Sequence, residues 1–537
     1  MNAAAPRTAG SGGWVALAAL PLLAVWLHQA WVSEDAHITL RTLEQLANGN
    51  GLRWNPDERV QTYSHPLWLF LTAGLDWLVR DPPWTLTLLG LACSLAAFLA
   101  LATSVPRRPA VLWLALTAPW VLSPSLTRYA TSGFENPLTH LWIALQAALV
   151  LRLQPGHPLP WGRLTLVAAL AGVTRLDTLV LHGPILLLLA AVQPRAIPWR
   201  RIARAAAPLI AWLAFSLFYY GSLLPNTALA KLAPGIPSAV LLEHGITYAA
   251  DLVVRDPVAA GILLAGWAAA IHAAGRFFRA RADAPAAGLA GLGAGSVAYT
   301  AAVVWNGGDF LSGRYLSAPV LACLALTAAS SGAAWAALKR ASSPIRWGLA
   351  LGIAAAAAGT YVGARAFLDS TGSSGVREIS AAHLALGGDG AWHPTPRARE
   401  FTQLGHATGQ RARAENADVA VLPVIGLAAL AAGPDLVLVD PYALSDPLLA
   451  RLTPAQPGRF APGHLAREIP AGYLKARDTG DTSDMDPALA RYYEKLRLVV
   501  AGPLLSPARL RALIELQLGV YDEQLAAYET GIRERTD

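Results

Sequence analysis

Charged residues are scarce in this sequence. Only 14% of the 537 residues are Asp, Glu, Lys or Arg, and 54% are hydrophobic. A soluble domain usually carries about 25% charged residues. The mean hydropathy is +0.39. This balance excludes an ordinary soluble protein and predicts a membrane protein.

Cysteine and cofactor-binding patterns are also scarce. The two cysteines, Cys93 and Cys323, lie inside apolar runs, where cysteine behaves as a small buried hydrophobe. We find no phosphate-binding or dinucleotide glycine pattern between a strand and a helix, and no zinc-ligand spacing. The fragment from His464 to Arg467 is too short to indicate zinc. Whether a divalent cation bridges a phosphate group to Glu34 or Asp35 is left open by the sequence.

Long apolar segments fill the first two thirds of the chain. They lie at about 14–31, 84–105, 110–123, 137–154, 162–174, 178–193, 205–220, 257–273, 286–304, 315–337 and 347–367. A membrane-spanning helix needs about 20 residues, so the segments around 110–123 and 162–193 are short for this role. The pattern predicts a polytopic α-helical membrane protein with about 11 transmembrane helices.

Basic residues predict the orientation of these helices. Residues 1–367 carry 25 Lys and Arg against 14 Asp and Glu. The cations gather in every second connection, at Arg107–Arg108, Arg152, Arg163, Arg195, Arg200, Arg201, Arg204, Arg276, Arg279, Arg281, Lys339, Arg340 and Arg346. By the positive-inside rule these connections are cytoplasmic, and the others face the periplasm or its equivalent. The basic charge therefore belongs to loops and does not indicate nucleic-acid binding.

The composition changes at about residue 368. Residues 368–537 carry 17 Lys and Arg against 21 Asp and Glu. Short apolar runs in 419–440 surround two glycines and favour strand, helix and strand, whereas 487–500 and 507–532 favour helices. We therefore predict two domains: a transmembrane domain over 1–367, and a soluble α/β domain over 368–537 outside the cytoplasmic membrane.

The stretch after the first apolar segment begins with two acids, Glu34 and Asp35. Ser33 can cap a helix that carries amphipathic spacing from Ala36 to Ala47 and stops at the glycines that follow. We expect this helix to lie on the membrane surface. Carboxylates where the lipid ends are costly unless they are hydrated, paired or used.

Four more outward connections bring acids and bases to the same side of the membrane. They add Arg128, Glu135, Arg175, Asp177, Lys231, Asp309 and Arg314. Acids suit a hydroxyl acceptor that must lose a proton, and cations suit a phosphate that must be held as it leaves. The set predicts an outward-facing enzyme that transfers a group from a lipid phosphate to a hydroxyl.

Each of these residues also has a structural interpretation. The acids could cap helices, and Arg175 with Asp177 could form an ion pair at a helix break. Lys231 could be a snorkelling anchor, and the residues of 305–316 could be loop structure. His65 could only cap the helix that Pro66 begins.

The stretch EDAHITLRTLEQLANGNGLRWNPDERVQTYSHPLW, residues 34–68, resembles the first outer loop of GT-C type glycosyltransferases. In that superfamily an acidic residue just after the first span is the usual catalytic candidate. The stretch is most similar to a bacterial arabinofuranosyltransferase subgroup that includes mycobacterial terminal arabinofuranosyltransferases. The resemblance continues in YYGSLLPNTALAK, GGDFLSGRYLSAP, VDPYALSDPLLAR and PGHLAREIPAGY.

This resemblance implies a multi-pass enzyme of the cytoplasmic membrane that moves arabinofuranose from a polyprenyl-phosphate donor to an outward hydroxyl. The acceptor would be a cell-envelope glycan or a surface protein. Asp35 becomes the leading catalytic acid, and Glu34 stands beside it where relatives often have a second Asp. Lys231 and Arg314, joined by Arg128, become donor-phosphate candidates.

The remaining candidates for sugar or acceptor binding are Asp309, Glu135, Arg175, Asp177 and His65. Two alternatives stay open: a GT-C transferase that uses a polyprenyl-phosphate hexose such as mannose, and a transporter of lipid-linked sugars. A transporter would more often show repeated halves and charges at mid-span. The mycobacterial relatives are longer than this chain, so the acceptor is an open question.

Overall fold

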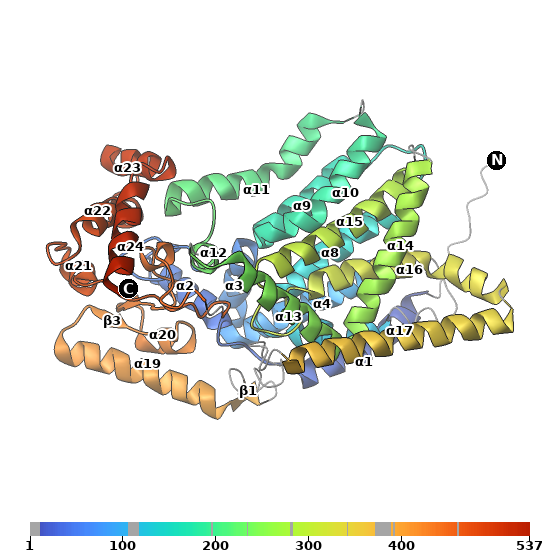
Figure 1. Cartoon of the computed structure of the whole chain (residues 1–537), viewed down its shortest axis with the longest axis horizontal. Coiled ribbons are helices and arrows are strands. Elements are labelled where there is room, and N and C mark those ends of the chain that lie inside the picture. Colours follow the sequence, from blue (N-terminus) through green and yellow to red (C-terminus); the bar gives the residue numbers. More distant parts are fainter. Residues whose placement is uncertain are drawn as a thin grey trace.

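The computed structural model describes residues 11–105, 117–194, 197–232, 235–279, 283–340, 342–370, 388–389, 393–458 and 461–536. Figure 1 shows two parts: a bundle of long helices and, to its left, the elements of the C-terminal third of the chain.

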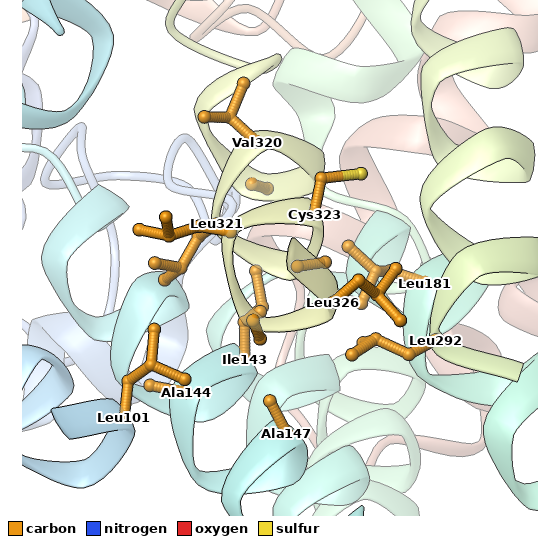
Figure 2. Close-up of a cluster of buried hydrophobic side chains, with 14 of the residues drawn as sticks. Leu101, Ile143, Ala144, Ala147, Leu181, Leu292, Val320, Leu321, Cys323 and Leu326 are labelled. Carbon is orange, nitrogen blue, oxygen red and sulfur yellow. The ribbon is translucent and has the colours of Figure 1, made fainter. Parts of the chain in front are cut away.

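The bundle consists of apolar helices. They are α1 (Ser11–His28), α3 (Pro66–Val79), α4 (Pro82–Ala102), α8 (Asn136–Leu151), α9 (Trp161–Thr174), α10 (Leu179–Val192), α11 (Trp199–Tyr220), α14 (Pro257–Arg279), α15 (Ala284–Trp305), α16 (Ser317–Arg340) and α17 (Ser343–Ser370). Figure 2 shows the apolar core between them, with Leu101, Ile143, Leu181, Leu292 and Leu321 turned toward one another. The core therefore joins helices that are far apart in the sequence.

Small residues let two of these helices pack closely. α10 packs along α15, and a Cβ at Gly295 would lie 2.0 Å from the carbonyl oxygen of Leu181. Only glycine permits this approach of one helix backbone to the other. The glycine-rich sequence of α15 is thus a packing feature of the bundle.

Among the described residues, four helices are by length and composition suited to cross a membrane: α4, α11, α14 and α15. Six further apolar stretches of the described chain are shorter: Ala19–His28, Pro66–Val79, Asn136–Leu151, Trp161–Thr174, Leu176–Val192 and Ser317–Gly332. The expected count of about 11 spans is therefore not confirmed. Half of the expected segment 110–123 lies outside the described residues, as do Arg107, Arg108, Arg195 and Arg281.

The C-terminal part contains the predicted strand, helix and strand. β3 (Val419–Val421) and β4 (Val437–Val439) pair in parallel with α20 (Leu427–Ala432) between them, and Ala420 lies opposite Leu438. α19 (Pro396–Glu415) packs on α20. The other elements are β1 (Gly388–Asp389), β2 (His393–Pro394), α21 (Tyr473–Thr479), α22 (Pro487–Ala501), α23 (Pro507–Gln517) and α24 (Asp522–Thr536). The helices expected in 487–500 and 507–532 are thus confirmed.

The remaining helices lie in the segments between these elements. They are α6 (Pro119–Leu122), α7 (Pro124–Thr127), η1 (Arg128–Ala130), η2 (Leu176–Thr178), α12 (Asn226–Lys231), α13 (Ser238–Arg255) and η5 (Leu449–Arg451). The sequence did not predict the amphipathic helix α13. α12 packs against η5, so the connection that ends at Lys231 touches the C-terminal part directly.

The helix after the acidic pair, α2 (Ala36–Ala47), is buried between the two parts and contacts α20 (Figure 1). Its apolar residues Ala36 and Leu40 pack with Trp68 on the bundle. Its polar residues Arg41 and Gln45 have no exposed surface. The C-terminal part therefore covers the polar face of α2, and the position of this helix at the membrane surface stays a prediction.

The start of α2 also differs from the prediction. Asp35 precedes the helix and makes no side-chain cap, while the Ser33 backbone N–H donates to the carbonyl of Ser132. Ser33 therefore ties the acidic pair to the connection before α8 and does not cap α2 through its side chain.

Candidate active site

A cavity of about 100 Å³ lies where the bundle meets the C-terminal part. It is lined by Glu34, Asp35, Ala36, Ile38, Thr39, Thr62, Tyr63, Ser64, His65, Gly133, Phe134, Thr227, Lys231, Phe310, Arg314, Tyr315, Pro423, Ile425, Tyr442, Leu444, Gly463 and His464. Five of the ten residues predicted from the sequence are in this lining: Glu34, Asp35, His65, Lys231 and Arg314. The cavity is therefore our candidate active site.

The two acids have different surroundings. Asp35 is half-buried and lines the cavity. Glu34 is buried, and its Oε1 accepts hydrogen bonds from the backbone N–H groups of Gly426 at 2.7 Å and Leu427 at 2.9 Å. Burial, and then the Asp35 carboxylate, raise the pKa of Glu34 to about 8. A Glu34 carboxyl with this pKa is largely protonated at neutral pH.

Two cations face the same cavity from different connections. Lys231 ends α12, and within the described part of the chain no carboxylate lies at ion-pair distance from its ammonium group. Arg314 lies over the ring of Phe134, with its guanidinium carbon 3.7 Å from the ring centroid. Burial alone would lower the pKa of both cations, but Tyr315 and Asp309 raise it. Both side chains therefore keep their positive charge.

A buried carboxylate behind the cavity holds its polar wall together. Glu135 is fully buried, accepts a hydrogen bond from Arg175, and lies 3.2 Å from Nδ1 of His65 and 3.7 Å from Nη2 of Arg314. Burial would raise the pKa of Glu135, but these neighbours, His65 first, hold it well below its usual range. Glu135 is thus an ionised counter-ion at neutral pH and not a proton donor.

His65 faces the cavity and does not cap the helix that it precedes. α3 begins at Pro66, and His65 makes no side-chain cap there. Its Nε2 instead lies 2.8 Å from the hydroxyl of Thr39. With Glu135 on the other ring nitrogen, the imidazole is fixed on both sides. The structure thus gives His65 a place in the cavity wall.

Three more of the predicted residues, Asp309, Arg175 and Asp177, lie outside the cavity lining formed by the described residues. Asp309 is buried, 3.5 Å from Arg314. Arg175 makes a two-pronged ion pair with Asp177, at 3.0 and 2.7 Å, and lies 4.6 Å from the ring of Tyr315. Their direct contact with a sugar stays a prediction.

Arg128 also lies away from this lining. Its carbonyl oxygen accepts a hydrogen bond from the indole of Trp31 at 2.8 Å, so its backbone helps to fix the end of the first connection. Its role as a phosphate ligand remains a prediction.

Sequence reasoning missed the aromatic side of the cavity. The His464 ring lies edge-on to Phe310 at 5.2 Å and to Tyr442 at 5.4 Å between centroids. Tyr442 and His464 come from the C-terminal part and line the cavity opposite the charged residues. Both occur in the motifs VDPYALSDPLLAR and PGHLAREIPAGY. These motifs carried the resemblance, but neither residue was singled out as a site residue.

The structure offers no ready cation site in the described residues. No group of three or more His, Cys, Asp and Glu side chains among them is arranged to hold a metal ion. A divalent cation at Asp35 would need oxygen ligands from a bound phosphate, as hard cations often take. This expectation remains a prediction.

Comparison with known proteins supports the resemblance. No family model matches the chain. The chain is 28% identical over 353 residues to a terminal beta-(1->2)-arabinofuranosyltransferase of Mycobacterium tuberculosis, with 58% of this chain and 54% of the relative covered. It is 30% identical over 372 residues to the protein of the same name from Corynebacterium glutamicum, with 60% and 53% covered.

Solved structures show a weaker likeness. ArnT from Cupriavidus metallidurans bound to undecaprenyl phosphate aligns with a TM-score of 0.45 at 17% identity, over 84% of this chain and 78% of that one. Its apo form gives 0.41 at the same identity, over 83% and 78%. Neither score supports an argument about this chain. The chain spans about half the length of the curated relatives it matches, and over that half it is similar to terminal arabinofuranosyltransferases.

Proposed function

We propose that this chain is a membrane glycosyltransferase of GT-C type that moves arabinofuranose from a polyprenyl-phosphate donor to a hydroxyl group outside the cytoplasmic membrane. The observation that carries the proposal is one cavity in which Asp35 faces Lys231 and Arg314. The similarity to terminal arabinofuranosyltransferases supports the choice of sugar. The acceptor is a glycan or a protein of the cell surface.

Lys231 and Arg314 bind the donor phosphate. Lys231 has no carboxylate partner at ion-pair distance in the described residues, so its charge is available to a ligand. Arg314 is already oriented by Glu135 and Asp309, which leaves its guanidinium fixed before the donor arrives. A fixed cation stabilises a leaving phosphate without reorganisation during the reaction.

Asp35 acts as the general base. The acceptor hydroxyl gives its proton to the Asp35 carboxylate while its oxygen forms a bond to the anomeric carbon. The bond between that carbon and the phosphate oxygen breaks, and polyprenyl phosphate leaves with both bonding electrons. Positioned general bases contribute about 10² to 10⁴ in rate.

Transfer is tested with purified protein in nanodiscs, a labelled polyprenyl-phosphate arabinofuranose and a synthetic oligoarabinofuranoside acceptor. We expect labelled product from this donor and none from polyprenyl-phosphate mannose. If only polyprenyl-phosphate mannose gives labelled product, the transferred sugar is a hexose and not arabinofuranose. Movement of the intact lipid-linked sugar across a vesicle membrane without transfer would favour a transporter. In cells, a deletion strain should lose terminal arabinofuranose from its envelope glycans.

The outward orientation is tested by cysteine labelling. Both native cysteines are buried, so an introduced cysteine is the accessible target. A membrane-impermeant maleimide added to spheroplasts should label Arg411→Cys, in the C-terminal part, and should spare Arg279→Cys at the end of α14. The reverse pattern would place Asp35 on the cytoplasmic side and contradict a lipid-phosphate donor outside.

A further inference from the structure

The acidic pair contacts a segment almost 400 residues away. Oε1 of Glu34 accepts the N–H groups of Gly426 and Leu427, 392 and 393 residues further along the chain. These two residues begin α20. One carboxylate oxygen of Glu34 thus already has two backbone N–H donors.

Gly426 makes this contact possible. A Cβ added there would lie 2.2 Å from the Glu34 carbonyl oxygen and 2.3 Å from its Oε1. Both distances are far below any van der Waals contact, so the backbone of the C-terminal part could not approach Glu34 with a side chain at this position. The approach therefore depends on glycine at 426 and on the length of the side chain at 34.

Arg41, in the helix α2 that follows Glu34, contacts the C-terminal end of α20. Arg41 donates to the carbonyl oxygens of Ala429, Gly433 and Leu436, the last two at 2.9 Å each. Glu34 lies just before α2, and Arg41 lies within that helix. They bind opposite ends of α20, the positive side chain at carbonyl groups and the acidic side chain at N–H groups. The C-terminal part therefore contacts the residues around Asp35 directly.

We propose that Glu34 is a positioning residue and not a second catalytic acid: it joins the segment 426–436 to the backbone that carries Asp35. Its consequence for turnover rests on the proposed function. The contact needs an acceptor oxygen that reaches two N–H donors, and a carbonyl oxygen at the same distance from the backbone meets that need.

Two conservative substitutions separate the length of the side chain at residue 34 from its charge. Glu34→Gln keeps the length and the acceptor oxygen but loses ionisation, whereas Glu34→Asp keeps ionisation but is one methylene shorter. We expect Glu34→Gln to retain kcat within about fivefold of the wild type. We expect Glu34→Asp and Glu34→Ala to lose about tenfold to a hundredfold in kcat, as for a lost buried hydrogen-bond pair. The donor KM should stay near the wild-type value in all three, because Lys231 and Arg314 are unchanged.

The opposite order would overturn the proposal. If Glu34→Asp is active and Glu34→Gln is as inactive as Glu34→Ala, the charge at residue 34 is required and Glu34 takes part in the reaction. Gly426→Ala is the matching variant on the other side of the contact. It should reproduce the kcat loss of Glu34→Ala with the donor KM unchanged, and a wild-type kcat there would also contradict the proposal.

A second measurement does not depend on arabinofuranosyl transfer. Hydrogen exchange of the full-length protein in nanodiscs should show faster exchange in peptides covering 426–436 in Glu34→Ala and Glu34→Asp, and wild-type exchange in Glu34→Gln. If the wild type transfers no sugar but exchange follows this order, the proposed function fails and the contact stands. Unchanged exchange in Glu34→Ala would show that the contact does not hold the segment.

Discussion

The two walls of the cavity differ in chemistry. The wall formed by 34–65, 133–134, 227–231 and 310–315 carries the acids and cations, including Asp35, Lys231 and Arg314. The wall formed by the C-terminal part carries Pro423, Ile425, Tyr442, Leu444, Gly463 and His464, with no Asp, Glu, Lys or Arg. The difference indicates a division of labour. Under the proposed function, we expect the charged wall to bind the phosphate and take the proton, and the uncharged wall with Tyr442 and His464, here called the aromatic wall, to contact a sugar.

The charged wall should be the more fragile of the two, because its ions are buried. Glu135→Ala leaves Arg175, Arg314 and His65 without their shared carboxylate. Removing one partner of a buried ion pair costs about 3–5 kcal/mol, so we expect a clear fall in the thermal unfolding temperature in detergent. Glu243→Ala, at an exposed residue of α13, is the control. Equal unfolding temperatures of the two variants would mean that the ion pairs of Glu135 do not stabilise the fold.

A change to Lys231 should weaken binding of the donor without unfolding the protein. Lys231→Ala removes a charge-assisted contact worth about 1.5–3 kcal/mol. Donor affinity, measured by binding of a fluorescent polyprenyl-phosphate sugar, should then fall about tenfold to a hundredfold. Lys475→Ala removes an exposed lysine paired with Asp481 and Asp484 and should bind normally. Normal binding by Lys231→Ala would make this lysine a membrane anchor.

A change to the aromatic wall should affect only the acceptor. Tyr442→Ala removes one ring beside His464, and aromatic contacts of this kind contribute about 0.5–1.5 kcal/mol. We expect the acceptor KM to rise about twofold to tenfold, with donor affinity unchanged. Tyr361→Ala, at an exposed tyrosine of α17, provides the comparison. A loss of donor affinity in Tyr442→Ala would contradict the division between the walls.

A further expected effect is a dependence of stability on pH at the contact between Glu34 and the C-terminal part. The folded protein raises the pKa of Glu34 from 4.5 to about 8, so the unfolded chain releases this proton first. Stability from Glu34 is therefore complete below about pH 4.5 and declines as the pH rises toward 8. The groups that act on Glu34 are Asp35 and the N–H groups of Gly426 and Leu427. The decline in unfolding temperature should be shallower in Glu34→Gln, and identical slopes would contradict the shifted pKa.

Much of the charged wall could be predicted from the sequence. In a chain so poor in charge, the few acids and cations of the outward connections are conspicuous, and Asp35, Lys231 and Arg314 do meet in one cavity. The apolar face of α2 was equally clear from its spacing. Such features depend on local pattern and on the side of the membrane that each connection faces.

The rest depended on contacts between distant segments. The partners of Glu34 and Arg41 are backbone groups of residues 426–436, and backbone groups carry no sequence signal. Tyr442 and His464 are ordinary residues in a segment of soluble composition, so nothing local marked them as cavity residues. The burial of the polar face of α2 against the C-terminal part could not be predicted for the same reason.

The most direct test of the account is the turnover of Asp35→Asn with a polyprenyl-phosphate arabinofuranose donor. Asparagine keeps the shape of the side chain but cannot take a proton from the acceptor. We predict normal expression and donor binding, with transfer reduced by about a hundredfold or more. Wild-type transfer by Asp35→Asn, together with an inactive Glu34→Gln, would contradict both the role of Asp35 and the positioning role of its neighbour.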